Sequence, residues 1–122
     1  MNTTQETIPT LPMYTLRRDD KPPLRFRGRQ LAYADTAGPN STRWTEVTVY
    51  RTAGGKCVLY IREVSQWQGE GTSRWGWTVS RPTEIPDYIR STLDCMPEDI
   101  SRMLSRLEEM PEFHGIWVEE VD

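Results

Sequence analysis

Four stretches of the chain are strand-like, because runs of apolar residues are bounded by segments rich in glycine and polar residues. They are rich in β-branched and aromatic residues, and they span Leu24–Asp35, Arg43–Arg51, Lys56–Val64 and Ser73–Ser80. The turn Ala53-Gly54-Gly55 separates the second stretch from the third, and the other connections are also rich in glycine or polar residues. Short connections favour antiparallel pairing of successive strands, so we predict a meander sheet.

Beyond Pro82 the apolar residues recur with the period of a helix. Ile85, Ile89 and Leu93 fall every four residues, which predicts a first helix with one apolar side. A second helix begins near Pro97, and its apolar stripe consists of Met96, Ile100, Met103, Leu104 and Leu107. Strands followed by helices predict an α+β fold, in which an antiparallel four- to five-stranded meander sheet is followed by two short C-terminal helices packed on one face.

One domain accounts for the regular part of the chain. A length of 122 residues suits a single domain, which we place at residues 24–122. Residues 1–23 are rich in threonine, proline and charge, and we expect a disordered or extended N-terminal arm there. At the other end, the β-prone segment Gly115–Val121 is a candidate for the fifth strand.

Charge is distributed unevenly along the chain. The net charge is only −3, but ten basic and four acidic residues lie between Arg17 and Arg62. Between Glu84 and Asp122 there are three basic and eleven acidic residues. Such asymmetry indicates an interaction role. The small negative total argues against a chain that is wholly a nucleic-acid or membrane protein.

Residue types that carry catalysis or hold metals are sparse. The chain has one histidine, His114, and two cysteines, Cys57 and Cys95, which form no C-x-x-C pair. No glycine-rich segment opens a helix as a phosphate-binding loop does. We therefore expect no catalytic site, no cofactor and no metal, and an enzyme of an unrecognised type is the last of three hypotheses. Since two cysteines are too few for a disulfide scaffold and no apolar run suits a signal peptide or membrane helix, we expect reduced thiols, a cytoplasmic setting and no membrane contact.

Arginine occupies every second position at Arg25, Arg27 and Arg29, with Leu24 and Phe26 at the alternate positions. In a strand, alternate side chains point to opposite faces, so the three guanidinium groups form one row. We consider three roles for this row. The first is an edge that is solvated or contacts the chain's own acidic segment. The second is a dock for a partner, and the third is a track for phosphates.

A sheet face with tyrosine and arginine is the second candidate for binding. Tyr50, Tyr60 and Arg62 would lie on the face away from the helices. Such a face can stack single-stranded nucleic acid or serve as a hot spot for a protein partner. Trp75 and Trp77 share one side of the fourth predicted strand, and the pattern leaves open whether that side is core or surface.

The acidic C-terminal part is the third candidate for binding. Its adjacent carboxylates do not share a helix or strand face, so they form no ready-made catalytic pair. They could instead cover a basic groove on a partner, where complementary charge would speed and orient the encounter. These residues are Glu108, Glu109, Glu119 and Glu120.

The runs Arg25–Ala32 and Arg43–Tyr60 look similar to small uncharacterised proteins from plasmids and phages of high-GC bacteria. This resemblance implies an accessory role on a mobile genetic element, and it carries no functional residue. From all these features we expect a small non-enzymatic protein-binding module of the accessory or inhibitor type, which docks through charged and aromatic surface. The alternative is a nucleic-acid-binding protein that uses the arginine and tyrosine sheet face.

Overall fold

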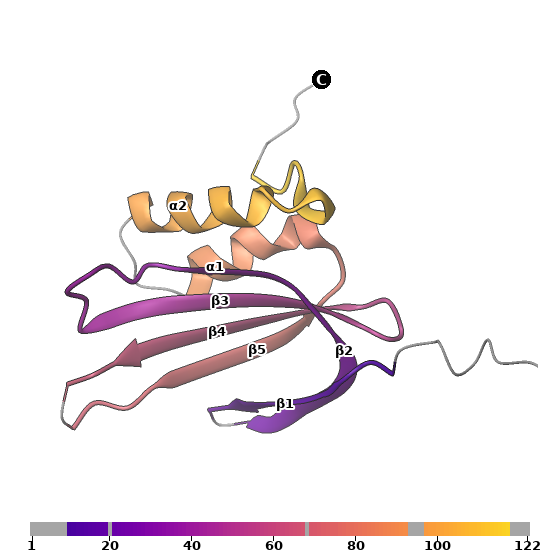
Figure 1. The fold of residues 1–122 in the computed structure, drawn as a ribbon, viewed down its shortest axis with the longest axis horizontal. Helices are drawn as coiled ribbons and strands as arrows, with labels where there is room; N and C mark the ends of the chain where they lie inside the picture. The colour runs from indigo at the N-terminus through magenta and orange to yellow at the C-terminus, as the bar shows by residue number, and fades with distance from the viewer. Residues whose placement is uncertain (1–9, 20, 68, 93–96, 118–122) are drawn as a thin grey trace, which may run out of the picture.

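The computed structural model describes residues 10–19, 21–67, 69–92 and 97–117, which form a curled antiparallel sheet with helices on one side (Figure 1). The strands are β1 (Met13–Arg18), β2 (Lys21–Asp35), β3 (Arg43–Thr52), β4 (Cys57–Ser65) and β5 (Ser73–Val79). The helical elements are η2 (Pro82–Glu84), α1 (Ile85–Thr92), α2 (Pro97–Glu108) and η3 (Pro111–Phe113), of which η2 and η3 are short 3-10 turns. Each strand pairs antiparallel with the next, in the order β1-β2-β3-β4-β5. The predicted α+β class, a meander sheet followed by two C-terminal helices, is confirmed.

The fifth strand comes from the N-terminal end of the chain. β1 lies inside the segment 1–23 that the sequence analysis treated as an arm, because Tyr14 and Leu16 alternate inward and pack against the sheet. The other candidate, Gly115–Val121, begins as a turn that follows η3. Residues 1–9 and 118–122 lie outside the described ranges.

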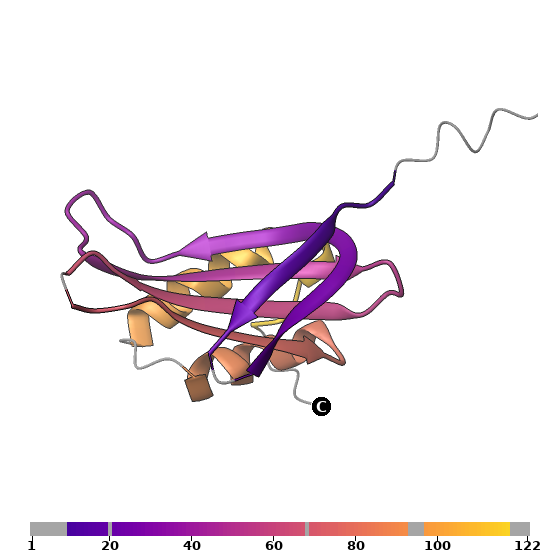
Figure 2. The same cartoon turned by 90° about the horizontal axis from the view of Figure 1, so that it is seen from below.

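β2 changes its partner at its middle. Its first half pairs with β1, and its second half, from Gly28 onward, pairs with β3. A Cβ atom at Gly28 would lie 2.2 Å from the carbonyl oxygen of Arg51, so this close approach of two strands requires glycine. An irregularity between Gln30 and Ala32 adds a bulge, which bends the strand further. The hairpin of β1 and the first half of β2 therefore turns underneath the rest of the sheet (Figure 1, Figure 2).

The helices cover the outer face of the curled sheet and form the main core with it. Val47 and Val49 of β3 lie opposite Ile61 and Leu59 of β4, and all four side chains are fully buried. The helical part contributes Ile85, Ile89, Met103, Leu104, Leu107 and Phe113. Apart from Phe113, these are apolar positions that the helical period predicted. Leu93 and Met96 of the predicted stripes lie outside the described side chains.

A second apolar cluster fills the inside of the curl, between the hairpin and the sheet. Its buried members are Leu16, Tyr50, Val58 and Tyr60, with Tyr14, Leu24 and Phe26 packed against them. The ring centroid of Tyr50 lies 4.7 Å from that of Tyr14. The Tyr60 hydroxyl donates a hydrogen bond of 2.6 Å to the carbonyl oxygen of Arg17. The open face expected around Tyr50 and Tyr60 is therefore a closed interior, because the hairpin covers it.

The end of β1 reaches the outer edge of β5 and partly closes the curl. The Asp19 N–H donates to the carbonyl oxygen of Arg74, and the Arg74 N–H donates to the Asp19 carboxylate, each at 3.1 Å. The Arg18 guanidinium donates to the carbonyl oxygen of Gly76 at 3.1 Å. Seen from below, β1 crosses the sheet diagonally toward this edge (Figure 2). These contacts fasten the hairpin over the second cluster.

Candidate docking surface

Arg25 and Arg27 project from the outside of the hairpin into solvent. Leu24 and Phe26, which alternate with the two arginines along β2, turn inward to the second cluster. This alternation leaves both arginines exposed. Arg25 Nε donates to Thr15 Oγ1 at 3.5 Å, and Arg27 Nη1 donates to the carbonyl oxygen of Leu11 at 3.2 Å. Each guanidinium contacts a neutral group and keeps its charge open to solvent.

Arg29 belongs to the same row but has a different neighbour. It follows the bend at Gly28, and its Nη2 lies 4.0 Å from the carboxylate of Glu112 in η3. Both side chains are substantially exposed, so this ion pair contributes little to stability. The row is thus divided: Arg29 faces the acidic C-terminal part, whereas Arg25 and Arg27 face solvent.

Two further exposed cations belong to the hairpin that carries these arginines. Arg17 of β1 and Lys21 at the start of β2 are both exposed. We call the set Arg17, Lys21, Arg25 and Arg27 the basic hairpin face. None of the four makes an ion pair within the described parts of the chain. Met13, which is 48% exposed, lies opposite Arg27 in the register and adds an apolar side chain beside the cations.

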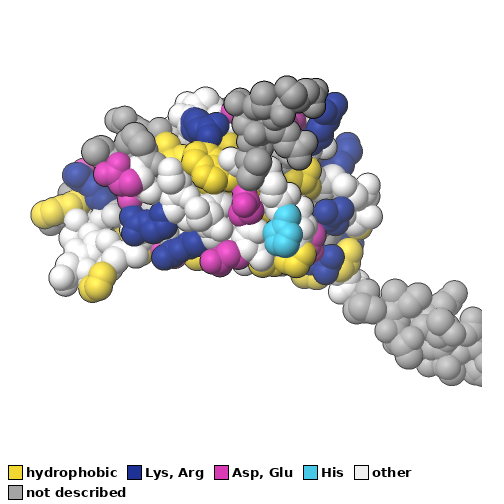
Figure 3. Space-filling model, turned by 90° about the horizontal axis from the view of Figure 1, so that it is seen from above, with side chains coloured by type: hydrophobic (Ala, Val, Ile, Leu, Met, Phe, Trp, Pro, Cys, Tyr) yellow, Lys and Arg dark blue, Asp and Glu magenta, His cyan; other side chains and the backbone are white. Residues whose placement is uncertain are grey.

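Several arginines on other parts of the molecule make ion pairs. Arg62, a predicted binding residue, lies 2.7 Å from the Glu46 carboxylate, which also accepts a hydrogen bond from the indole of Trp44. The ion pairs on the helices are Arg90 with Asp87, Arg102 with Asp99, and Arg106 with Asp35 of β2. Figure 3 shows basic and acidic side chains intermixed across the helix side. The basic hairpin face differs from that side because, among the described residues, its four cations make no ion pair.

The acidic C-terminal residues are divided between internal contacts and solvent. A carboxylate oxygen of Glu108 accepts a hydrogen bond of 3.0 Å from the backbone N–H of Trp117, so Glu108 ties the end of the described chain to α2. Glu109 is exposed just after α2. Glu119 and Glu120 lie outside the described ranges.

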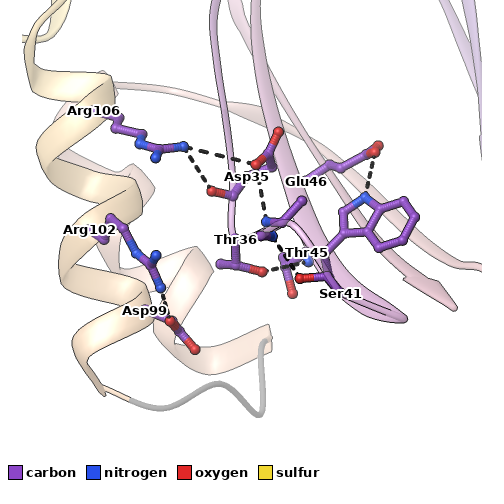
Figure 4. Close-up of polar contacts among 11 residues, drawn as sticks. Asp35, Thr36, Ser41, Thr45, Glu46, Asp99, Arg102 and Arg106 are labelled. Carbon is purple, nitrogen blue, oxygen red and sulfur yellow. Dashed lines mark hydrogen bonds and ion pairs between the residues drawn. The ribbon is translucent and has the colours of Figure 1, made fainter.

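The loop between β2 and β3 is held against α2 by polar contacts (Figure 4). Arg106 Nη1 donates to the carbonyl oxygen of Asp35 at 3.1 Å. The Asp35 carboxylate accepts the Ala37 N–H at 3.1 Å, and Thr36 Oγ1 accepts the Thr45 N–H at 2.9 Å. These groups satisfy one another, so their role is to position the loop.

An open cavity of about 590 Å³ is lined by β3, β4, β5 and Asp99 of α2. On its wall, the Arg43 guanidinium makes hydrogen bonds of 3.0 and 2.6 Å to the Glu70 carboxylate. This pairing, with a hydrogen bond from the Ser65 hydroxyl, holds the pKa of Glu70 below its usual range. The contacts fix a loop that carries Trp67, which is 55% exposed. Trp67 has no signal in the sequence, because a residue in an irregular loop belongs to no periodic pattern.

Trp75 and Trp77 lie on the helix side of β5. The sequence left open whether this side is core or surface, and the structure places it at the core. Both are partly buried and pack against the main core. The ring centroid of Trp77 lies 5.2 Å from that of Tyr88 in α1. The two tryptophans therefore form the border of the core along the edge of the sheet.

Groups that could carry chemistry are dispersed. His114 is exposed after η3, and Cys57 is buried in β4, where burial raises the pKa of its thiol. Cys95 lies outside the described ranges. Among the residues that the structure describes, no three His, Cys, Asp or Glu side chains gather where they could hold a metal ion. Within the same ranges, every helix is too short or too polar to cross a membrane.

No family model, no curated protein and no solved structure matches this chain. The resemblance to plasmid and phage proteins, and the cytoplasmic setting, therefore stay predictions.

Proposed function

We propose that this chain is a small protein-binding module, and that the basic hairpin face docks an acidic surface of a partner protein. What carries the proposal is the exposure of the four hairpin cations, none of which makes an ion pair in the described parts of the chain. Arginine offers carboxylates a rigid fork of donors, which gives such docking geometric specificity. An accessory or inhibitor protein would use this surface to cover a site on its target.

The surroundings of the basic hairpin face favour a protein partner over nucleic acid. The nearby rings of Tyr14, Phe26 and Tyr50 point into the second cluster and contact one another. They offer no exposed platform on which a base could stack. The net charge of −3 also opposes the approach of a long polyanion. We therefore propose a protein partner, and the experiment below distinguishes it from nucleic acid.

The charge layout would orient an acidic partner toward the hairpin. Residues 13–27 contain five basic and two acidic residues, whereas residues 84–112 contain three basic and eight acidic ones. The hairpin and the helices lie on opposite sides of the main sheet (Figure 1). An acidic surface would be attracted to one side and repelled by the other, which mainly raises the association rate at low salt.

Removal of two hairpin cations should abolish capture of the partner. Wild-type protein, the double variant Arg25→Ala with Arg27→Ala, and a control with Lys56→Ala and Arg81→Ala are immobilised and exposed to a nuclease-treated lysate of the native host. Lys56 and Arg81 are exposed and lie off the hairpin, so the control loses the same charge. We expect the hairpin variant to capture at least about tenfold less partner than the other two, measured by quantitative mass spectrometry.

Two results would redirect this proposal. Equal capture by the hairpin variant and the control would show that the basic hairpin face is not the docking surface. Capture that disappears on nuclease treatment, with binding to a single-stranded oligonucleotide that weakens steeply with salt, would favour the nucleic-acid alternative.

A further inference from the structure

Part of the outer edge of β5 has free backbone groups. Both backbone groups of Arg74 bond to Asp19, which lies outside the sheet. Since alternate residues of a strand direct their N–H and C=O groups to the same side, those of Gly76 and Thr78 also point outward. The Gly76 carbonyl is taken by Arg18. Within the described residues, the Gly76 N–H and both backbone groups of Thr78 have no hydrogen-bond partner.

The protection that natural edge strands usually carry ends at Gly76. Edges are normally covered, shortened, or marked by proline, lysine or a bulge, because a free edge pairs with other extended chains. Here the end of β1 covers Arg74 and Gly76, and Thr78 is exposed beyond it. β5 pairs with β4 without a bulge from Cys57–Val79 to Glu63–Ser73. At Thr78, β5 is thus a regular strand that pairs on one side with β4 and has no neighbour on its other side among the residues that the structure describes.

Different side chains flank this edge on its two sides. On the helix side, Trp77 and Tyr88 contact each other and are only partly buried, which is the type of residue that dominates protein hot spots. On the hairpin side, Arg18, Asp19, Lys21 and Arg74 line a small cavity of about 40 Å³ against Gly76. One side of the edge is therefore aromatic, and the other carries three cations and one carboxylate.

We propose that an extended acidic segment of a partner protein adds to β5 as a further strand at Thr78. Its apolar side chains pack against Trp77 and Tyr88, and its alternate, acidic side chains face Arg18 and Lys21. The main chain supplies the pairing, and the two sides of the edge select a segment in which apolar and acidic residues alternate. This inference rests on the proposed function, because it names how the acidic partner is recognised beside the basic hairpin face.

The cations near the β5 edge favour an acidic partner segment over a second copy of this chain. Two β5 edges that paired with each other would bring Arg18, Lys21 and Arg74 of both copies toward one interface, and like charges there are costly. A partner segment with carboxylates meets the same cations favourably. Self-association is therefore the outcome that contradicts the proposal.

The probe is a labelled peptide of eight residues that alternates valine and glutamate, and its affinity for the full chain is measured by fluorescence anisotropy. Thr78→Pro removes the outward N–H but no hydrogen bond to β4, since Thr78 does not donate to that strand. Thr78→Val leaves the backbone donor in place and serves as the control. We expect Thr78→Pro to weaken binding at least about tenfold and Thr78→Val to leave it unchanged. A peptide that alternates valine and lysine should not bind.

Amide hydrogen exchange provides a second measurement, which does not depend on whether Thr78→Pro folds. In the wild-type protein, peptide binding should slow exchange of the Gly76 and Thr78 N–H groups. Unchanged exchange at both amides, absence of peptide binding, or a dimer that forms through the β5 edge in sedimentation would overturn the inference. If Arg25→Ala with Arg27→Ala still abolishes capture of the native partner, the proposed function stands although strand addition fails.

Discussion

Gly28 decides where the arginine row divides. It interrupts a strand of large side chains at the point where β2 leaves β1 and joins β3. The alternation of Arg25 and Arg27 with apolar residues is readable from the sequence, because it depends only on the strand period. The need for glycine is not readable, because it depends on the Arg51 carbonyl of another strand.

Gly28→Ala should destabilise the protein by about 1–3 kcal/mol, because its Cβ would collide with backbone that cannot move without breaking the sheet. Gly71→Ala is the matched control, since a Cβ there meets nothing within 4 Å. Chemical denaturation of both variants measures the difference in the free energy of unfolding. Equal stability of the two variants would show that the bend does not depend on close approach at Gly28.

At the scale of elements, the hairpin of β1 and β2 explains most of what the sequence analysis could not foresee. The other strands and both helices lie close to their predicted ranges, because their apolar periods are regular. β1 was assigned to an arm because it lies in residues 1–23, which are rich in threonine, proline and charge. Its stability as a strand comes from contacts with Phe26 and Tyr50, which are distant in sequence.

The contact between Asp19 and Arg74 should control how firmly the hairpin is held. Asp19→Ala removes the acceptor of the Arg74 N–H and should cost about 1 kcal/mol of local stability. Asp19→Asn keeps an oxygen acceptor and should cost less. The measurement is hydrogen exchange, in which hairpin amides should exchange faster in the alanine variant while those of α1 and α2 stay unchanged. If amide exchange became faster to the same extent in all elements, the contact between Asp19 and Arg74 would not stabilise the hairpin locally.

At the scale of the whole molecule, the curled sheet separates two apolar interiors and two charged outer sides. The main core lies under the helices, and the second cluster lies under the hairpin. Tyr50 and Tyr60 belong to the second cluster, and burial raises the pKa of both hydroxyl groups. Their environment therefore links the closure of the curl to the protonation of two tyrosines.

Stability should fall at alkaline pH. A tyrosine with a raised pKa in the folded chain holds its proton more tightly than in the unfolded chain, so stability is full below the usual tyrosine pKa of about 10 and is lost as the pH rises above it. Denaturant unfolding at a series of pH values from about 8 to about 11.5 measures this loss. The double variant Tyr50→Phe with Tyr60→Phe should show a shallower decline. A decline of equal slope in the variant would assign the effect to other groups.

The sequence by itself determined the order of the elements, the two sides of each strand and the sign of charge in each half of the chain. The reason is that period, turn chemistry and charge are local properties. Only the tertiary structure decided which sides are covered. Tyr60 is closed in by a residue 43 positions away and Asp19 binds one 55 positions away, so neither contact has a local signal. The tertiary structure likewise decided that Arg25 and Arg27 are exposed to solvent, whereas Arg29 lies close to Glu112, a residue distant in sequence.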